Sequence, residues 1–475
     1  MSTSPRNNPS AGTTPGTVTP DSTTTEASSL GPAFNTDRTI TPMQRKVLAG
    51  GSVGQFIEFY DFALYGLSAT VLAQLFFPGD SQLVGLLTLF ASYGVAFLFR
   101  PLGGLYFGAL GDRIGRRKVL AITLLLIGAA TTAIGLLPTA ATIGALAPIL
   151  LVTCRLLQGF SAGGESVGAP AFVFEHAPVH RRGFFINITL AATALPSVFA
   201  ALLILVLSTS MSDSAFETWG WRIPFLIALP LAAFGLWIRN KTEESPVFQE
   251  MLDEQQTAAE QAKQELSDEG HGVSPLKDAF RTNWVQMLQV LFVMGLTAMG
   301  FYFLSGYFVS YVETSGGLSR PQSLALNAVA MAAYTLLLPI MGAIGDRLGR
   351  RPMLIGGSIA IAVLAMPAFL LVTSGSVALA MCGQLLFVLA ITFYGGGCYT
   401  FFVEVFETKH RFTSAAVSYN VGYALLGGTA PFVGTALVGA TGISFSPAFW
   451  VIGVAVVVLA LIFVTKVPET RGRIH

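Results

Sequence analysis

Twelve long apolar segments, joined by short polar connections, make up most of this chain of 475 residues. Each segment is roughly 20 residues or longer, the length that a helix needs to cross the hydrocarbon core of a bilayer. The pattern predicts an all-α membrane protein with twelve transmembrane helices in two pseudo-symmetric six-helix bundles. The expected limits are Met43–Phe77, Leu83–Leu110, Val119–Leu137, Ile143–Phe174, Gly183–Leu207, Trp221–Ile238, Trp284–Val312, Gln322–Ile344, Met353–Val372, Val377–Val403, Thr413–Val438 and Pro447–Val464.

Polar stretches set the expected domain boundaries. Residues 1–40 are rich in Ser, Thr, Pro and Gly and lack the apolar core of a signal peptide, so we expect a disordered cytoplasmic segment that is not cleaved. The acidic, helix-favouring stretch at 239–283 is expected to be a cytoplasmic loop between the bundles. The bundles are residues 41–238 and 284–466, and residues 467–475 form a cytoplasmic tail.

The composition excludes several classes of function. Hydrophobic residues make up 53% of the chain and charged residues only 11%, whereas a soluble protein carries about a quarter charged residues. The net charge of +1 suggests no nucleic-acid partner. The three cysteines lie in apolar segments without metal-ligand spacing, and no nucleophile or phosphate-binding motif is present. We therefore expect neither an enzyme nor a bound metal or cofactor.

Lys and Arg are distributed unevenly between the two sets of connections. Of these 27 residues, Arg100 and Arg155 lie within segments, and Arg222 and Arg320 lie at one set of connections. The remaining 23 (27 less four) lie at the other set or in the termini. Because positive residues accumulate on the cytoplasmic side of a membrane, both termini are predicted to be cytoplasmic in a multi-pass protein of the inner or plasma membrane.

Two near-identical polar loops point to an internal duplication. GALGDRIGRRKVL from Gly108 and GAIGDRLGRRPML from Gly342 are identical at nine of thirteen positions and lie 234 residues apart. A repeat of this period indicates that one unit has been doubled. Two facing bundles of membrane helices are typical of a transporter, because rocking one against the other exposes a central site to either side in turn.

The repeated loops carry a pattern that predicts a latch between the bundles. Gly108 and Gly342 let adjacent helices approach closely, and Gly115 and Gly349 permit a tight turn between helices. The aspartate is the only acid among clustered arginines, placed to accept hydrogen bonds from an arginine or a helix N-terminus. A weaker repeat, a carboxylate seven residues before an arginine, follows the fourth and tenth segments. The predicted latch residues are Gly108, Asp112, Arg113, Gly115, Arg116, Asp346, Arg347, Arg350, Glu175, Arg182, Glu404 and Arg411.

These loops resemble the signature of the major facilitator superfamily. RLLQGFSAGGESVGA resembles the superfamily's helix 4 motif, with Arg155 followed by Gly159 and Gly163. GQFIEFYDFALYG, FLFRPLGGLYFG, WGWRIPFLIALP and EESPVF resemble segments of the metabolite:proton symporters. The resemblance extends over nearly everything from Arg45 to Glu469.

The resemblance implies uptake of a small metabolite together with protons, as in transporters of 2-oxoglutarate, citrate, shikimate, proline or betaine. The fifth segment lacks the GxxxGPxxG pattern of drug:proton antiporters. No coiled coil like that of some osmosensing proline/betaine members follows the last segment, which counts against an osmolyte function without excluding it. The terminal VPETRG is similar to the tail of sugar porters.

Ionisable side chains are few within the segments, where each costs about 2.5 to 3.5 kcal/mol. Counted by helical rise, Glu58 and Arg100 lie about 18 Å from the cytoplasmic boundary and Glu165 about 15 Å. Three charges on three helices would then share one level near the midplane. Arg155 lies about 30 Å up by the same rule, nearer the external face, where a structural and a functional role are equally open.

These charges suggest how a solute and a proton could be coupled. Arg100 would bind a substrate carboxylate bidentately, and its departure from a neighbouring carboxylate would favour protonation there. The alternative is a static ion pair of Glu58 or Asp61 with Arg100 that only holds two helices together. The predicted substrate-binding residues are Arg100, Tyr65, Gln55, Tyr394, Tyr419 and Asn420, and the predicted proton-coupling residues are Glu58, Asp61 and Glu165.

The second half carries no charge within its segments before Glu404, so we expect it to contribute shape and hydrogen bonds while the first half contributes charge. Glycine runs at Gly159–Gly164 and Gly395–Gly397 lie in equivalent segments and permit either close packing or local unwinding.

The resulting prediction is proton-coupled symport of an organic acid or zwitterion by a monomer in contact with lipid. The alternatives are a proton-independent facilitator of a sugar or polyol, a membrane enzyme and a transporter-like nutrient receptor.

Overall fold

The computed structural model describes residues 56–79, 81–114, 116–163, 173–174, 177–243, 275–406 and 411–472. The predictions for residues 1–40 and for most of the acidic loop lie outside these residues. The first half contains the helix Phe56–Leu67, α2 (Ala69–Phe76), α3 (Gln82–Ile114), α4 (Arg116–Leu136), α5 (Ala140–Ile143), α6 (Leu146–Ala162), α8 (Arg182–Ala191), α9 (Leu195–Ser210), α10 (Asp213–Ala215), α11 (Arg222–Leu226) and α12 (Ala228–Glu243). The second half contains α14 (Pro275–Tyr302), α15 (Phe308–Thr314), α16 (Arg320–Leu348), α17 (Arg350–Val372), α18 (Val377–Glu404), α19 (Arg411–Gly422), α20 (Ala430–Thr441) and α21 (Pro447–Val464).

The predicted twelve spans are present among the described residues. Nine helical segments are long and apolar enough to cross a membrane, and the bent pair Phe56–Leu67 and Ala69–Phe76 makes a tenth. Two shorter apolar helices, Ala121–Leu136 and Leu146–Ala162, complete the twelve. The last span coincides with its predicted limits, Pro447–Val464.

Several of the spans are less regular than the sequence predicts. The first bends by 67° between its two helices, at Ser68. The fifth is not one helix but two, α8 and α9, because Pro196 in the first turn of α9 has no backbone N–H to continue the ladder. Short π-helical turns also interrupt the seventh and eleventh spans at Phe303–Tyr307 and Tyr423–Gly428.

The outer surface of the bundle is apolar. Large side chains such as Leu105, Phe234, Leu336 and Val363 are exposed along the sides of the helices. Exposed apolar side chains in such number suit a lipid environment, in which only helices and closed barrels satisfy their own backbone hydrogen bonds.

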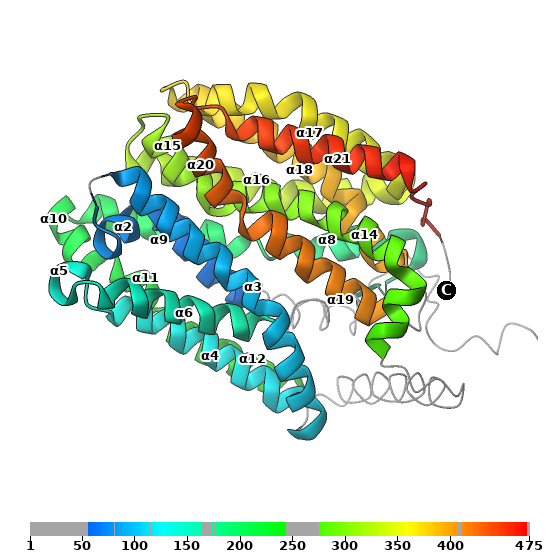
Figure 1. Cartoon of the computed structure of the whole chain (residues 1–475), viewed down its shortest axis with the longest axis horizontal. Coiled ribbons are helices and arrows are strands. Elements are labelled where there is room, and N and C mark those ends of the chain that lie inside the picture. Colours follow the sequence, from blue (N-terminus) through cyan, green and yellow to red (C-terminus); the bar gives the residue numbers. More distant parts are fainter. Residues whose placement is uncertain are drawn as a thin grey trace, which may run out of the picture.

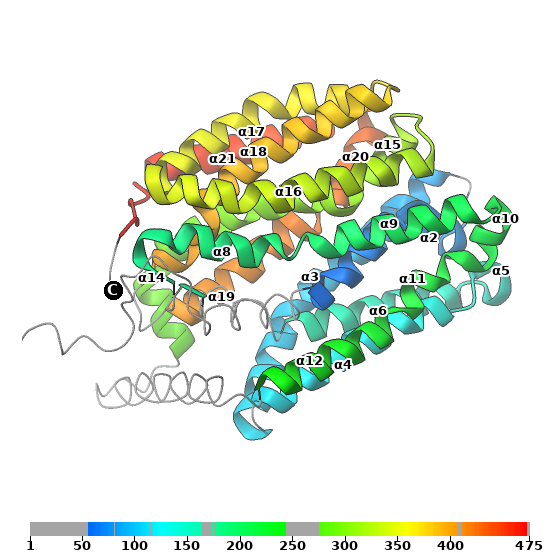
Figure 2. The ribbon, with the colours of Figure 1, turned by 180° about the vertical axis from the view of Figure 1, so that it is seen from behind.

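The two halves meet along two pairs of spans. In one pair, α16 of the second half packs against α8 and α9 of the first (Figure 2). In the other pair, α3 packs against α19 and α20 (Figure 1). The repeated loops place one end of the bundle at the junctions of α3 with α4 and of α16 with α17, which we call the arginine-rich end. The junction of α15 with α16 lies at the opposite end.

Candidate functional site

Two buried ion pairs lie side by side in the first half. The Nη2 of Arg100 donates to Oε1 of Glu58 at 2.5 Å, and both side chains are at most 2% exposed. The Nη1 of Arg155 lies 3.8 Å from Oδ2 of Asp61, and its Nη2 donates to the Asp61 carbonyl at 3.5 Å. Neither carboxylate oxygen of Asp61 accepts a hydrogen bond from a side chain among the described residues. One carboxylate is therefore held tightly, and the other is compensated only at a distance.

Glycines in α6 set the position of Arg100. A Cβ on Gly159 would lie 1.9 Å from the carbonyl oxygen of Ala96, and a Cβ on Gly163 would lie 1.9 Å from that of Arg100. No side chain fits at either place, so α6 crosses α3 backbone to backbone. This contact fixes Arg100 against the fourth span and supports the packing role of these glycines.

Arg155 lies farther from the arginine-rich end than Arg100. Gly159 and Gly163 face Ala96 and Arg100 of α3, so Arg155 lies four residues before the level of Ala96, or about 12 Å from Arg100 along the span. This register agrees with the depth counted by helical rise. The side chain of Arg155 still reaches Asp61, three residues beyond Glu58 in the first span.

Aromatic rings enclose both guanidinium groups. The Cζ of Arg100 lies 5.0 Å from the ring centre of Phe62 and 5.1 Å from that of Phe97. The Cζ of Arg155 lies only 3.4 Å from the ring of Tyr65. These are distances at which a cation is attracted to a ring face. Tyr65 is held in place by a 2.6 Å hydrogen bond with Ser92.

The second half adds tyrosines to the same enclosure. The ring of Tyr302 contacts Phe97 at 5.0 Å, and Tyr302 and Tyr419 are close enough to Arg100 to interact with it electrostatically. Tyr419 stacks on Tyr423 at 4.0 Å. The charged centre is thus covered on one side by uncharged aromatic side chains from the other half.

The remaining predicted binding residues make hydrogen bonds within the second half or lie outside the described residues. Tyr394 donates to the carbonyl of Val293 and packs on Gly357, so its hydroxyl is used between helices of the second half. The Nδ2 of Asn420 donates to Ala416 in its own helix. Gln55 and Glu165 lie outside the described residues.

A polar cluster joins the two halves at the arginine-rich end. The carboxylate of Asp346 accepts hydrogen bonds from the backbone N–H groups of Gly183 and Phe184, at 2.8 and 2.9 Å, in the first turn of α8. It also accepts one from Nη1 of Arg350 at 3.0 Å. Anions are favoured at helix N-termini. Gly342 permits the approach, since a Cβ there would lie 2.5 Å from the carbonyl oxygen of Gly183.

Within the second half, the same cluster continues to Glu404 and the tail. Arg350 donates from Nε and Nη2 to the two oxygens of Glu404, at 3.0 and 3.1 Å, and Thr470 adds a hydrogen bond at 2.8 Å. The carboxylate of Glu469 accepts from the backbone N–H groups of Arg350 and Arg351 at the start of α17. The turn before α17 requires Gly349, whose φ of +100° disfavours other residues.

The first-half counterparts of this cluster are described only in part. The Cζ of Arg182 lies 4.1 Å from the ring centre of Phe174. In the second half, the carbonyl oxygen of Arg347 accepts a hydrogen bond from Nη1 of Arg471. Gly115 and Glu175 lie outside the described residues, and so do the side-chain positions of Gly108, Asp112, Arg113, Arg116 and Arg411.

Sequence reasoning missed several members of both sites. Tyr93, Phe97 and Arg100 follow helical spacing on one face of α3, so that pattern contained a usable signal. Tyr302 and Tyr423 come from π-helical interruptions or their edges, which no sequence pattern marked. Glu469 and Thr470 belong to the VPETRG tail, whose contact with α17 becomes visible only in three dimensions.

Comparison with known proteins agrees with this architecture. The family model described as sugar (and other) transporter matches residues 48–475. A proline/betaine transporter of Escherichia coli (strain K12) is 36% identical over 429 residues, which cover 90% of this chain and 84% of the relative. A shikimate transporter of the same strain is 33% identical, covering 83% and 88%, and a citrate-proton symporter of Klebsiella pneumoniae is 31% identical, covering 86% and 91%.

A crystal structure of a D-xylose-proton symporter has the same fold. Its TM-score is 0.70 at 21% identity, and the match covers 91% of this chain and 99% of that one. The chain is a multi-pass membrane transporter and not an enzyme. It belongs to the sugar (and other) transporter family of the major facilitator superfamily, among relatives of the metabolite:proton symporters.

Proposed function

We propose that this transporter imports a small zwitterion, a carboxylate joined to an alkylated ammonium group, together with protons. The observation that carries the proposal is the pairing of Arg100 with Glu58 inside an aromatic enclosure formed by both halves. Arg100 supplies a fork for a carboxylate. The faces of Tyr302, Tyr419 and nearby rings suit an alkylated ammonium group, for which aromatic cages are a common binding site.

The balance of charge supports a zwitterion over a polyanion. Among the described residues of the central site, the charges of Arg100 and Arg155 are balanced by those of Glu58 and Asp61. A solute without net charge preserves this balance. A di- or tricarboxylate would add uncompensated negative charge in a region shielded from water, which is costly. The relatives named for proline, betaine and ectoine agree with this choice.

The geometry suggests which carboxylate carries the proton. Glu58 would lose the hydrogen bond from Arg100 when a substrate carboxylate takes over that arginine. Asp61 lacks a side-chain hydrogen bond on either oxygen, and its nearest cation is 3.8 Å away. Protonation of Asp61 would remove a buried charge that its surroundings compensate poorly. We assign the transported proton to Asp61 and the solute-dependent switch to Arg100 and Glu58.

The distribution of arginines supports a topology in which the arginine-rich end faces the cytoplasm. On this orientation both termini are cytoplasmic, Asp346 and Glu404 lie at the inner end, and the junction of α15 with α16 lies at the outer end. A proton-independent facilitator of a neutral sugar would leave Arg100 and both carboxylates without a role, so the structure does not favour it.

Uptake into proteoliposomes tests the proposal. With an inward proton gradient, labelled glycine betaine or proline should accumulate, and a protonophore should collapse the accumulation. Unlabelled citrate and xylose should compete poorly. The Arg100→Gln variant should lose about 10- to 100-fold in affinity, the value of a charged hydrogen bond.

The coupling assignment needs a variant that separates binding from accumulation. Asp61→Asn should retain betaine exchange between the two sides but should no longer accumulate it. Glu217→Gln, a change at an exposed carboxylate of the outer end, is the matched control and should behave as wild type. Equilibration without accumulation in the wild type, or full accumulation by Asp61→Asn, would contradict the proposal.

A further inference from the structure

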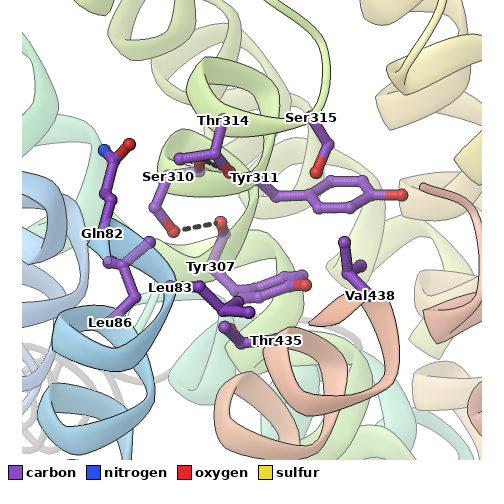
Figure 3. Close-up of a pocket in the computed structure, with 10 residues that line it drawn as sticks. All are labelled: Gln82, Leu83, Leu86, Tyr307, Ser310, Tyr311, Thr314, Ser315, Thr435 and Val438. Atoms are coloured by element: carbon purple, nitrogen blue, oxygen red, sulfur yellow. Dashed lines mark hydrogen bonds between the residues drawn. The ribbon is translucent and has the colours of Figure 1, made fainter. Parts of the chain in front are cut away.

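A cleft of about 210 Å³ opens between the two halves at the outer end. It lies between the start of α3, at Gln82 and Leu86, and the second-half residues Tyr307, Ser310 and Thr435. Figure 3 shows the rings of Tyr307 and Tyr311 one above the other across it, with the Ser310 hydroxyl donating to the Tyr307 carbonyl. Because both bundles line the cleft, any rocking motion changes its width.

Aromatic rings separate this cleft from Arg100. The ring of Tyr307, which lines the cleft, packs against Phe90, with 5.9 Å between the ring centroids. One turn further inward, Tyr93 contacts Tyr302 at 5.9 Å, and Tyr302 contacts Phe97 beside Arg100. The cleft and the charged centre therefore lie on one path, which is closed by rings from α3 and the seventh span.

Beside the cleft, a second set of contacts joins the two halves. Oε1 of Glu313 lies 3.8 Å from Nε of Arg320, and these side chains are 12% and 24% exposed. Both belong to the second half, yet both reach the first. Glu313 interacts with the side chain of Thr70 on α2, and the Cζ of Arg320 lies 5.6 Å from the ring of Phe216. We call Glu313, Arg320, Thr70 and Phe216 the outer latch.

The spans that carry these contacts are broken where they cross. A Cβ on Gly66 would lie 2.9 Å from the Cα of Gly306, and a Cβ on Gly306 would lie 2.8 Å from the Cα of Gly66. The first span bends by 67° at Ser68, just beyond this crossing, and the seventh forms its π-helical turn around Gly306. The outer segment of each span can therefore pivot at a place where no side chain intervenes.

One helix connects the outer latch to the cluster at the inner end. Arg320 begins α16, and Asp346 lies near its last turn, 26 residues on, so roughly 39 Å of continuous helix separates them. Tilting α16 against α8 and α9 would separate one end as it closes the other. In this structure the Glu313–Arg320 pair and the contacts of Asp346 with α8 are both formed.

We propose that the outer latch is the gate of the outer access route. It stabilises the state that is closed at the outer end, whereas the polar cluster around Asp346 stabilises the state that is closed at the inner end. Loss of the outer latch shifts the population toward a state open through the cleft, and loss of Asp346 shifts it the other way. The proposal rests on alternating access by this transporter, but neither on the solute nor on the coupled proton.

Labelling of a cysteine in the cleft tests the proposal without any substrate. The parent carries Ser310→Cys and Cys382→Ser, which removes the exposed native cysteine, while Cys154 and Cys398 stay buried. The probe is a membrane-impermeant maleimide added from outside. Glu313→Gln and Arg320→Met should each label roughly fivefold faster than the parent, the factor for a partly exposed ion pair. Asp346→Asn should label no faster, or more slowly.

Two further measurements separate gating from loss of structure. The same variants without Ser310→Cys should stay unlabelled at Cys398, because a rise there would reveal unfolding. The exchanged pair Glu313→Arg with Arg320→Glu restores the ion pair within the second half but places a carboxylate at the Phe216 ring, so it should still label faster than the parent. Equal labelling of the parent and both single variants, or an equal rise with Asp346→Asn, would overturn the proposal. Betaine transport could then still stand, since labelling does not depend on it.

Discussion

The two halves of the molecule share one architecture but contribute different chemistry to the centre. The first half buries two arginines and two carboxylates within its spans, and the second buries tyrosines at the same place. Duplication preserved the helices and the glycine contacts, whereas the central side chains diverged. Charge on one side and uncharged rings on the other form a site that can recognise both ends of a zwitterion.

The sharpest test of this division is the stability of its charged half. Arg100→Gln leaves Glu58 buried without its cation and should reduce the free energy of unfolding by about 3–5 kcal/mol. The double variant with Glu58→Gln should recover most of that stability but not transport. Thermal unfolding in detergent measures the first effect, and betaine uptake measures the second.

The matched change in the second half should be far milder. Tyr334 and Tyr399 share a 3.0 Å hydroxyl hydrogen bond, and Tyr334→Phe should cost only about 0.5–1.5 kcal/mol. If it cost as much as Arg100→Gln, or if the double variant of the first half transported betaine normally, the contrast between the halves would be lost.

A second comparison concerns the glycine contacts that both halves retain. A Cβ on Gly163 would meet a carbonyl oxygen at 1.9 Å, and one on Gly396 would meet another at 2.5 Å. Gly163→Ala should therefore reduce the free energy of unfolding by about 1–3 kcal/mol, because the fourth span must move away from α3. Gly396→Ala should reduce it less. Gly453→Ala, with nothing within 4 Å, is the control and should be neutral or slightly stabilising. Chemical denaturation measures the free energy of unfolding of the three variants. Equal stability of Gly163→Ala and Gly453→Ala would show that the crossing is loose.

The smallest expected effect concerns the rings of the second half. Tyr302→Phe keeps the ring and should change betaine affinity little. Tyr302→Leu removes the ring face and should weaken betaine binding by about 0.5–2 kcal/mol, or roughly 2- to 30-fold. Equilibrium binding to purified protein measures both variants. A larger loss in Tyr302→Phe than in Tyr302→Leu would assign the contribution to the hydroxyl and not to the ring.

The fold could be predicted closely from the sequence, and the site only in outline. Hydropathy located twelve spans because a helix in lipid must be apolar over a fixed length, and that requirement appears residue by residue. The duplicated loops marked the ends of α3 and α16. Breaks such as the one at Ser68 left no comparable trace, since they depend on how neighbouring helices cross.

Particular side chains show where prediction stopped. Glu58, Asp61 and Arg100 were found because charge in an apolar segment is conspicuous. Their pairing was not, because the sequence allowed either acid to pair with Arg100. Tyr394 was predicted at the solute, and its hydroxyl donates to the Val293 carbonyl in this structure. Aromatic residues are common in membrane helices, so their number hid the few that face Arg100.

The sequence by itself therefore determined the membrane class, the doubled bundle and the set of charges that must be sheltered from lipid, because these follow from local composition and spacing. Only the tertiary structure decided that Arg100 pairs with Glu58 and Arg155 with Asp61, and that Asp346 meets the start of α8. Such contacts join residues tens to hundreds of positions apart. They depend on where glycines let backbones touch, which is a property of crossing helices and not of any one segment.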